Sequence, residues 1–93
     1  MREIKYGNRF KRDYRREQSG IFGKKLDGLL NEAFGFLLVD APLPPRYVDH
    51  ALAGEWNDHR DCHIRPDLVL IYRKLDDDTL ELVRLGSHSE LGL

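Results

Sequence analysis

Two side chains suited to phosphoryl chemistry stand four residues apart near the C-terminus, in the run LVRLGSHSEL (82–91). The guanidinium of Arg84 can hold a phosphate through two parallel hydrogen bonds. The imidazole of His88 can take up or release a proton near neutral pH. Gly86 lies between them and has no side chain that would keep the backbone away from a ligand. Because an arginine and a histidine near a chain end are usually only solvated, a function depends on what the rest of the chain adds.

Three strands are predicted in the C-terminal half of the chain. The runs RDCHI (60–64), DLVLIYRKL (67–75) and TLELVRLG (79–86) are apolar and β-branched or alternate with period two. Three consecutive aspartates (76–78) supply a turn between the last two runs. Together these features predict an antiparallel meander.

Alternation along each strand predicts which side chains share a face of the sheet. In the first strand, Asp61 and His63 are expected on the same face. In the last strand, Arg84 is expected to project with Leu80 and Leu82.

A tight meander also sets the end of one strand beside the start of the next. It can therefore gather five candidate side chains at one end or face of the sheet: His50, delivered by the preceding loop, His63, Asp67, Arg84 and His88. Such a cluster suits cleavage of RNA by its own 2′-hydroxyl, which needs a base, an acid and a cation near the phosphorane. A structural interpretation stays open, in which Arg84 pairs with an acidic neighbour and Asp67 is a turn residue.

The N-terminal half predicts one short strand and two helices. Residues 2–6 alternate with period two, and Asn8 is a suitable N-cap for a helix that ends near residue 18. A second helix is expected over residues 21–39, where an apolar stripe recurs with a period of 3.6 residues. A proline-rich loop (40–58) follows, and ordered loops of this length are often functional.

The chain end and the composition complete the expected organisation. Ser87 and Glu90 have the spacing of a capping box, which predicts one closing helical turn from about His88. At 93 residues, with 41% hydrophobic and 33% charged residues, the chain is expected to form a single soluble domain, 1–93. One cysteine excludes an internal disulfide and suits a reducing cytoplasm. No apolar run is long enough to span a membrane or to act as a signal segment.

The formal net charge of −1 conceals a basic N-terminal segment. Residues 1–25 hold nine basic side chains against three acidic ones, which indicates an anionic partner, with nucleic acid first. The alternative is a solvated helix face with charges of both signs, and the charge pattern alone leaves both open. Four side chains of the first helix are predicted to bind RNA: Lys11, Arg12, Arg15 and Arg16.

A zinc site built from His59, Cys62 and His63 is the main alternative for the histidines. Adjacent side chains on a strand diverge, and no second pair of ligands with zinc-finger spacing is present. We therefore expect no metal and no cofactor, and we assign His59 to the surface.

The pattern DH…LxGxW…RDCHIRPDLVLIY…LVRLGSHSEL resembles the RelE/ParE superfamily of bacterial type II toxins, and within it the YafQ-like branch. The similarity is nearly gapless from about residue 44 to residue 91, and the helical hairpin before it fits in order and length. The resemblance implies an α+β fold, with an N-terminal strand and a two-helix hairpin packed on a twisted antiparallel sheet. It also implies a ribosome-dependent endoribonuclease that cuts mRNA in the A site. A cognate antitoxin would neutralise it in a hetero-oligomer that can bind operator DNA through the antitoxin.

The same resemblance implies roles for the five candidate residues. Arg84 would hold the scissile phosphate, His50 and His88 would transfer protons, and His63 with Asp67 would support them. Which imidazole is the base stays open. The basic first helix would contact ribosomal RNA.

One position departs from the family pattern. Relatives end with an aromatic residue that stacks on an mRNA base, whereas this chain has Gly92 followed by Leu93. Two alternatives to an active nuclease remain; the histidine set argues against the first, and only Gly92 supports the second. One is a toxin that acts only by binding, as ParE relatives without this histidine set do, and the other is a remnant with weakened activity.

Overall fold

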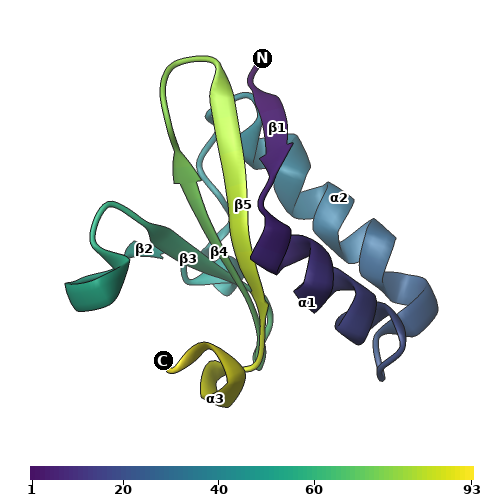
Figure 1. The fold of residues 1–93 in the computed structure, drawn as a ribbon. Coiled ribbons are helices and arrows are strands. Elements are labelled where there is room, and N and C mark those ends of the chain that lie inside the picture. The colour runs from purple at the N-terminus through teal and green to yellow at the C-terminus, as the bar shows by residue number, and fades with distance from the viewer.

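A five-stranded sheet carries two helices on one face, as the computed structural model of residues 1–93 shows (Figure 1). The strands lie in the order β1-β5-β4-β3-β2. Their bounds are β1 Glu3–Tyr6, β2 His50–Ala51, β3 Arg60–Arg65, β4 Leu68–Lys74 and β5 Thr79–Gly86. The helices are α1 Asn8–Gln18, α2 Leu26–Leu37 and α3 His88–Leu91, with short 3₁₀ turns at Gly23–Lys25, Pro45–Tyr47 and Gly54–Trp56. No helix has the length and apolar character needed to cross a bilayer.

The predicted α+β class and the β3-β4-β5 meander are confirmed. In detail the sheet is mixed, because the N-terminal strand β1 pairs in parallel with β5, from Glu3 beside Thr79 to Tyr6 beside Leu82. A parallel pair needs a long crossover between its strands, and here the helices and the rest of the sheet provide it. The proline-rich loop also contains β2, a two-residue strand that the sequence did not predict.

The first helix begins one residue earlier than predicted and ends at Gln18, as predicted, whereas the second helix is shorter at both ends than the predicted 21–39. Gly7, not Asn8, is the N-cap of α1, and no side chain caps this end. A Cβ at Gly7 would lie 2.8 Å from the carbonyl oxygen of Leu82, so only glycine allows the chain to leave β1 so close to β5. The second helix starts at Leu26, because residues 23–25 form a 3₁₀ turn that opens with a positive φ of 22° at Gly23.

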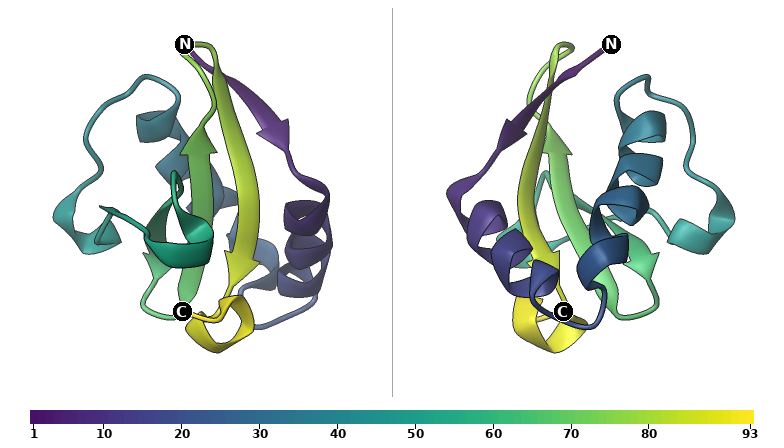
Figure 2. Two further views of the ribbon diagram at one scale, coloured as in Figure 1. Left: turned by 60° about the vertical axis from the view of Figure 1, so that its left-hand side comes forward. Right: turned by 90° about the vertical axis from the view of Figure 1, so that its right-hand side faces the viewer.

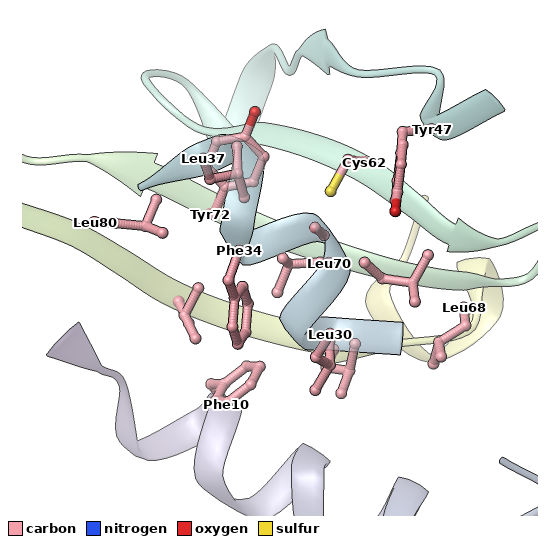
Figure 3. Close-up of a cluster of buried hydrophobic side chains, with 14 of the residues drawn as sticks. Phe10, Leu30, Phe34, Leu37, Tyr47, Cys62, Leu68, Leu70, Tyr72 and Leu80 are labelled. Carbon is pink, nitrogen blue, oxygen red and sulfur yellow. The ribbon is translucent and has the colours of Figure 1, made fainter. Parts of the chain in front are cut away.

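The main core lies between the helices and one face of the sheet (Figure 3). Phe10 of α1 and Phe34 of α2 pack there with Leu70 and Tyr72 of β4. Cys62 belongs to the same cluster, and burial raises the pKa of its thiol, so it is an inert packing group. The helices therefore occupy one face of the sheet and leave the other for a different use (Figure 2).

A β-bulge in β5 reverses the face on which Arg84 projects. Tyr72 pairs with Leu82, but the preceding Ile71 pairs with Arg84, so Val83 is an extra residue. Directly paired residues point to the same side of a sheet, and Ile71 lies on the side away from the helices. The prediction that Arg84 projects with Leu80 and Leu82 is therefore wrong, because alternation stops at the bulge.

Candidate functional site

Three imidazoles form a row on the sheet face opposite the helices. His50 comes from β2, His63 from β3 and His88 from α3. The ring centroids of His50 and His63 are 6.4 Å apart, and those of His63 and His88 are 5.0 Å apart, each pair edge to face. The segments that carry the outer two, β2 and α3, both lie on the side of the sheet away from α1 and α2 (Figure 1). The structure thus brings together the three predicted catalytic histidines.

Asp67 holds His88 in place through two hydrogen bonds. The sequence predicted that the meander would bring these two residues together. Oδ1 of Asp67 accepts hydrogen bonds from the backbone N–H of His88 at 2.9 Å and from its Nδ1 at 2.7 Å. The backbone bond first, and then the side-chain bond, lower the pKa of Asp67, so this carboxylate is ionised at neutral pH. Because Nδ1 donates to Asp67, Nε2 of His88 is the nitrogen left for a substrate.

The capping box that starts α3 fixes where His88 stands. The backbone N–H of Ser87 donates to Oε1 of Glu90 at 2.9 Å, and the N–H of Glu90 donates to Oγ of Ser87 at 3.1 Å. This confirms the predicted motif. The short helix then closes at Gly92, whose φ of 72° is left-handed, and the N–H of Leu93 donates to the carbonyl of His88 at 2.9 Å. Gly92 therefore has a structural use as the residue that ends α3.

His50 is oriented by a backbone carbonyl and lies beside a buried carboxylate. Its Nδ1 lies 2.8 Å from the carbonyl oxygen of Val48 and 3.1 Å from Oδ1 of Asp61. Only the contact with Val48 has hydrogen-bond geometry, since Oδ1 of Asp61 has no hydrogen-bond partner. A carbonyl can only accept, so Nδ1 carries the proton and Nε2 of the neutral ring has a free lone pair.

Asp61 is a further candidate for the site, which the sequence analysis did not include among its site residues. It pairs with His50 across the sheet, is 2% exposed, and its Oδ1 lies 4.0 Å from Nε2 of His63. Burial raises the pKa of this carboxyl, although the nearby histidines oppose the shift. A buried acceptor without a hydrogen bond is uncommon, and a place beside two histidines makes this carboxyl a candidate for the site. In the sequence, its position two residues before His63 on one strand was the feature that could have pointed to it.

Arg84 lies on the same face as the histidine row but is held away from it. Across the sheet it is in one row with His50, Asp61 and Ile71. Its Nε donates to Oδ2 of Asp13 at 2.6 Å, and its Nη2 donates to Oδ1 at 3.3 Å. The pairing with an acidic neighbour, which the sequence left open, is what the structure shows. Its role toward a phosphate stays a prediction.

Asp13 is the shared acceptor of a group of hydrogen bonds that joins α1 to the end of β5. It is 4% exposed and also accepts the backbone N–H of Leu85 at 3.0 Å and Nη1 of Arg16 at 3.0 Å. Burial alone would raise the pKa of Asp13. The hydrogen bonds from Arg84 and Leu85, together with the two arginine charges, outweigh burial and lower it.

Arg16 and Gly86 turn out to be parts of the same packing arrangement. Arg16 donates to the carbonyl of Leu85 at 2.8 Å, and its Nε lies 3.0 Å from Glu90, so it ties α1 to the end of β5 and to α3. A Cβ at Gly86 would lie 2.8 Å from Nη2 of Arg16 and 3.1 Å from Oε1 of Glu90. The space beside Gly86, expected for a ligand, is filled by these side chains.

The other predicted RNA-binding residues separate onto two surfaces. Lys11 and Arg15 line a cavity of about 510 Å³ between α1 and α2, together with Tyr6 and Tyr14. Arg12 lines a different hollow beside β5. The basic helix therefore does not present one continuous charged face.

An apolar floor lies beside the histidine row. Val69 and Ile71 of β4 are covered there by Leu91 of α3 and by Leu52 and Trp56 of the long loop. His59 stands at the edge of this loop. Its ring packs against Trp56 at 5.4 Å, and its Nδ1 lies 3.0 Å from the carbonyl of Asn57. No three histidine, cysteine or carboxylate side chains are arranged to hold a metal ion.

Nearly all of the chain matches known proteins. A sequence model described as a bacterial toxin of type II toxin–antitoxin systems, YafQ, matches residues 2–92. The mRNA interferase toxin YafQ of Escherichia coli K12 is 37% identical over 94 residues, which cover 98% of this chain and 96% of that relative. A copper-bound mutant toxin from Helicobacter pylori superposes with a TM-score of 0.88 at 42% identity, covering 98% of this chain and 99% of that one. A chain of the Escherichia coli DinJ–YafQ complex gives a TM-score of 0.77 at 33% identity, covering 98% of both.

Proposed function

The chain belongs to the YafQ family of bacterial type II toxins, and we propose that it is an endoribonuclease that cleaves ribosome-bound mRNA by acid–base chemistry. The observation that carries the proposal is the row of three imidazoles beside the buried carboxylate of Asp61. The family relative from Escherichia coli is an mRNA interferase, which supports RNA as the substrate. Action on ribosomes would take place in the cytoplasm.

His50 is the general base of the proposed reaction. Its Nδ1–H is donated to the carbonyl of Val48, so Nε2 can accept the proton of the RNA 2′-hydroxyl. As that proton leaves, the 2′-oxygen attacks the adjacent phosphorus.

His88 is the general acid. Its Nδ1 faces the ionised carboxylate of Asp67 at 2.7 Å, and a negative charge at this distance stabilises a positively charged imidazole. Nε2 then gives its proton to the 5′-oxygen as the bond between phosphorus and that oxygen breaks. The products are a 2′,3′-cyclic phosphate on one fragment and a 5′-hydroxyl on the other.

His63 lies between the acid and the base, where the charge of the phosphorane develops. As an imidazolium it would offset that charge, and Asp61 behind it would stabilise the imidazolium in turn. Arg84 lies two strands away from His63 and shares its guanidinium with Asp13. We therefore propose that His63 stabilises the charge of the phosphorane and that Arg84 contacts the neighbouring part of the substrate strand.

The antitoxin is the expected protein partner. A family relative forms the DinJ–YafQ complex, and on that basis this chain would be neutralised by an antitoxin of its own. Binding of operator DNA would be a property of that hetero-oligomer through the antitoxin.

The proposal is tested by expressing the chain in a translating extract and mapping new mRNA 5′ ends. The wild-type chain and His59→Ala should produce them, and His88→Ala should not. A toxin that acts only by binding would stop translation without new ends, and in that case the histidine row has no catalytic role.

A further inference from the structure

A hollow of about 390 Å³ at the edge between α1 and β5 is lined by four arginines and one aspartate. Its walls contain no apolar residue. The arginines are Arg9, Arg12, Arg16 and Arg84, and the carboxylate is that of Asp13. We refer to this feature as the arginine pocket.

The carboxylate of the arginine pocket is already fully engaged. Asp13 is buried and accepts hydrogen bonds from Arg84, Arg16 and the backbone N–H of Leu85. Arg16 is further occupied by Glu17, Glu90 and a backbone carbonyl. These two arginines form the rigid back of the pocket and have partners within the protein.

The two remaining arginines have no such partners. Arg9 and Arg12 are exposed and make no hydrogen bond or ion pair. The guanidinium of Arg9 lies 5.9 Å from the centre of the Trp56 ring, which sets it between the pocket and the apolar floor. Two uncompensated guanidiniums beside a saturated carboxylate make a site for an anion, and planar arginine forks match the oxygens of a phosphate.

The position of the pocket indicates which phosphate it takes. Arg84 lies in the same cross-strand row as Asp61 and His50. Neighbouring strands are about 4.8 Å apart, so β5 lies roughly 10 Å from β3 and from His63. The pocket is thus beside the histidine row, on the same face, at a distance that suits the next part of one extended strand.

We propose that the arginine pocket binds a backbone phosphate of the substrate RNA strand, next to the scissile phosphate, and so fixes which bond lies over the histidines. The proposal rests on the proposed function, since it names the substrate strand of that reaction. The unpaired guanidiniums of Arg9 and Arg12 would bind the phosphate. Arg84 and Arg16, which are held by Asp13, form the wall of the pocket.

The test compares two double variants that remove the same charge. Arg9→Gln with Arg12→Gln alters the pocket, and Lys24→Gln with Lys25→Gln alters two exposed lysines on the turn before α2, outside it. The probe is a short single-stranded DNA, which has no 2′-hydroxyl and cannot be cleaved. Binding is measured over a range of salt concentrations, and thermal unfolding shows that both variants are folded.

The pocket variant should bind the probe about tenfold more weakly. In a plot of log affinity against log salt concentration, the magnitude of its slope should fall by about 0.7, the value for one lost phosphate contact on a single strand. The lysine variant should keep both. Equal weakening of the two variants would overturn the proposal, since charge alone would then explain binding. Normal probe binding with lost ribosome binding would also overturn it, because the phosphate would then belong to ribosomal RNA. Neither measurement depends on cleavage, so failure of the nuclease proposal is detected separately.

Discussion

The three imidazoles of the histidine row differ in what each one touches. His50 donates to a neutral carbonyl, His88 donates to an ionised carboxylate, and His63 stands between them near Asp61. The hydrogen-bond partners of His50 and His88 leave Nε2 of each ring without a partner in the protein, as the proposed base and acid require. The proposed roles of base, acid and charge stabiliser rest on these different neighbours.

Replacement of His88 by alanine should slow cleavage by about 10²–10⁴-fold, the usual contribution of a positioned acid. The domain should stay folded, because this side chain is 39% exposed and lies outside the main core. The measurement is the rate of mRNA cleavage on ribosomes, with thermal unfolding in parallel. His59→Ala is the matched control. Near-normal cleavage by His88→Ala would remove the acid from the mechanism.

Replacement of Asp61 by asparagine should stabilise the domain and reduce its activity. Burial raises the pKa of this carboxyl, against the histidines of the row and with the help of Asp49, so its ionised form is disfavoured in the folded state. At pH 7 the neutral amide should raise the free energy of unfolding by about 1 kcal/mol. As the pH falls through and below the unfolded value near 4, the carboxyl becomes protonated in both states, so the gain should disappear. Urea unfolding at several pH values measures this.

The opposite result for Asp61 would be equally informative. If the asparagine variant is less stable at pH 7, the carboxylate makes a net favourable interaction with charged histidines in the resting protein. In that case Asp61 is an ion-pair partner of the row, and the disfavoured charge assigned to it is wrong.

At the scale of elements, the bulge in β5 and the buried carboxylate of Asp13 connect α1 to the sheet face that carries the histidine row. The bulge at Val83 turns Arg84 to the face that carries the histidine row. The pairing of β1 with β5 ends at Leu82, so Arg84 can reach past the unpaired edge of β5 to Asp13 on α1. Asp13 also holds Arg16, and Arg16 holds the start of α3 through Glu90. The helix that covers the core thus also positions the segment that carries His88.

Asp13→Asn should destabilise the domain by about 3 kcal/mol at pH 7, because it leaves the largely buried Arg84 without its charged partner. The pKa of Asp13 is lowered in the folded state, so its contribution is complete above the unfolded value near 4. The contribution is lost as the pH falls through the lower folded value. The difference between wild type and variant should therefore shrink below about pH 4.

Asp77→Asn, an identical change in an exposed turn, is the control for Asp13→Asn. Its free energy of unfolding should match that of the wild type across the pH range. A similar loss in both variants, or a loss for Asp13→Asn that persists in acid, would show that Asp13 does not act through its charge.

Gly92→Phe should supply the aromatic tail that the family resemblance implies, at the cost of strain. Gly92 has a φ of 72°, where an L-residue costs about 1–2 kcal/mol, so Gly92→Ala is the matched control with the same strain and no ring. Stacking on a base contributes about 1–3 kcal/mol, so the phenylalanine variant should cleave roughly ten- to a hundredfold faster than the alanine variant. Equal rates would mean that this tail does not orient the substrate.

The sequence predicted the histidine row well and the arginine network poorly, for different physical reasons. His63 and Asp61 alternate on one strand, which is a local pattern. Arg84 and Asp13 are 71 residues apart, and no periodicity connects them. A signal for the bulge was present, since the three-residue step from Leu82 to the next core leucine breaks the period of two.

The parallel pairing of β1 could not be predicted for a related reason. It depends on where α1 and α2 return the chain, and therefore on packing between distant segments. The α+β class was accessible because each helix and strand has its own local period.

In the molecule as a whole, the main core and the candidate site lie on opposite faces of the sheet, and α1 and α2 cover only the core face (Figure 2). One face is buried by α1 and α2, and the other carries the histidine row with its small apolar floor. The arginine pocket at the shared edge belongs to the second face, whereas Lys11 and Arg15 lie in the groove between the helices. The basic side chains of α1 are therefore divided between two hollows.

The measurement that tests this account most directly is the chemistry of the new 3′ end after ribosome-bound mRNA is cut. Attack by the 2′-hydroxyl leaves a 2′,3′-cyclic phosphate or the 3′-phosphate that forms from it, and we expect this end to persist with EDTA present and magnesium kept sufficient for intact ribosomes. A 3′-hydroxyl end, or loss of cleavage on adding the chelator, would contradict acid–base catalysis by His50 and His88.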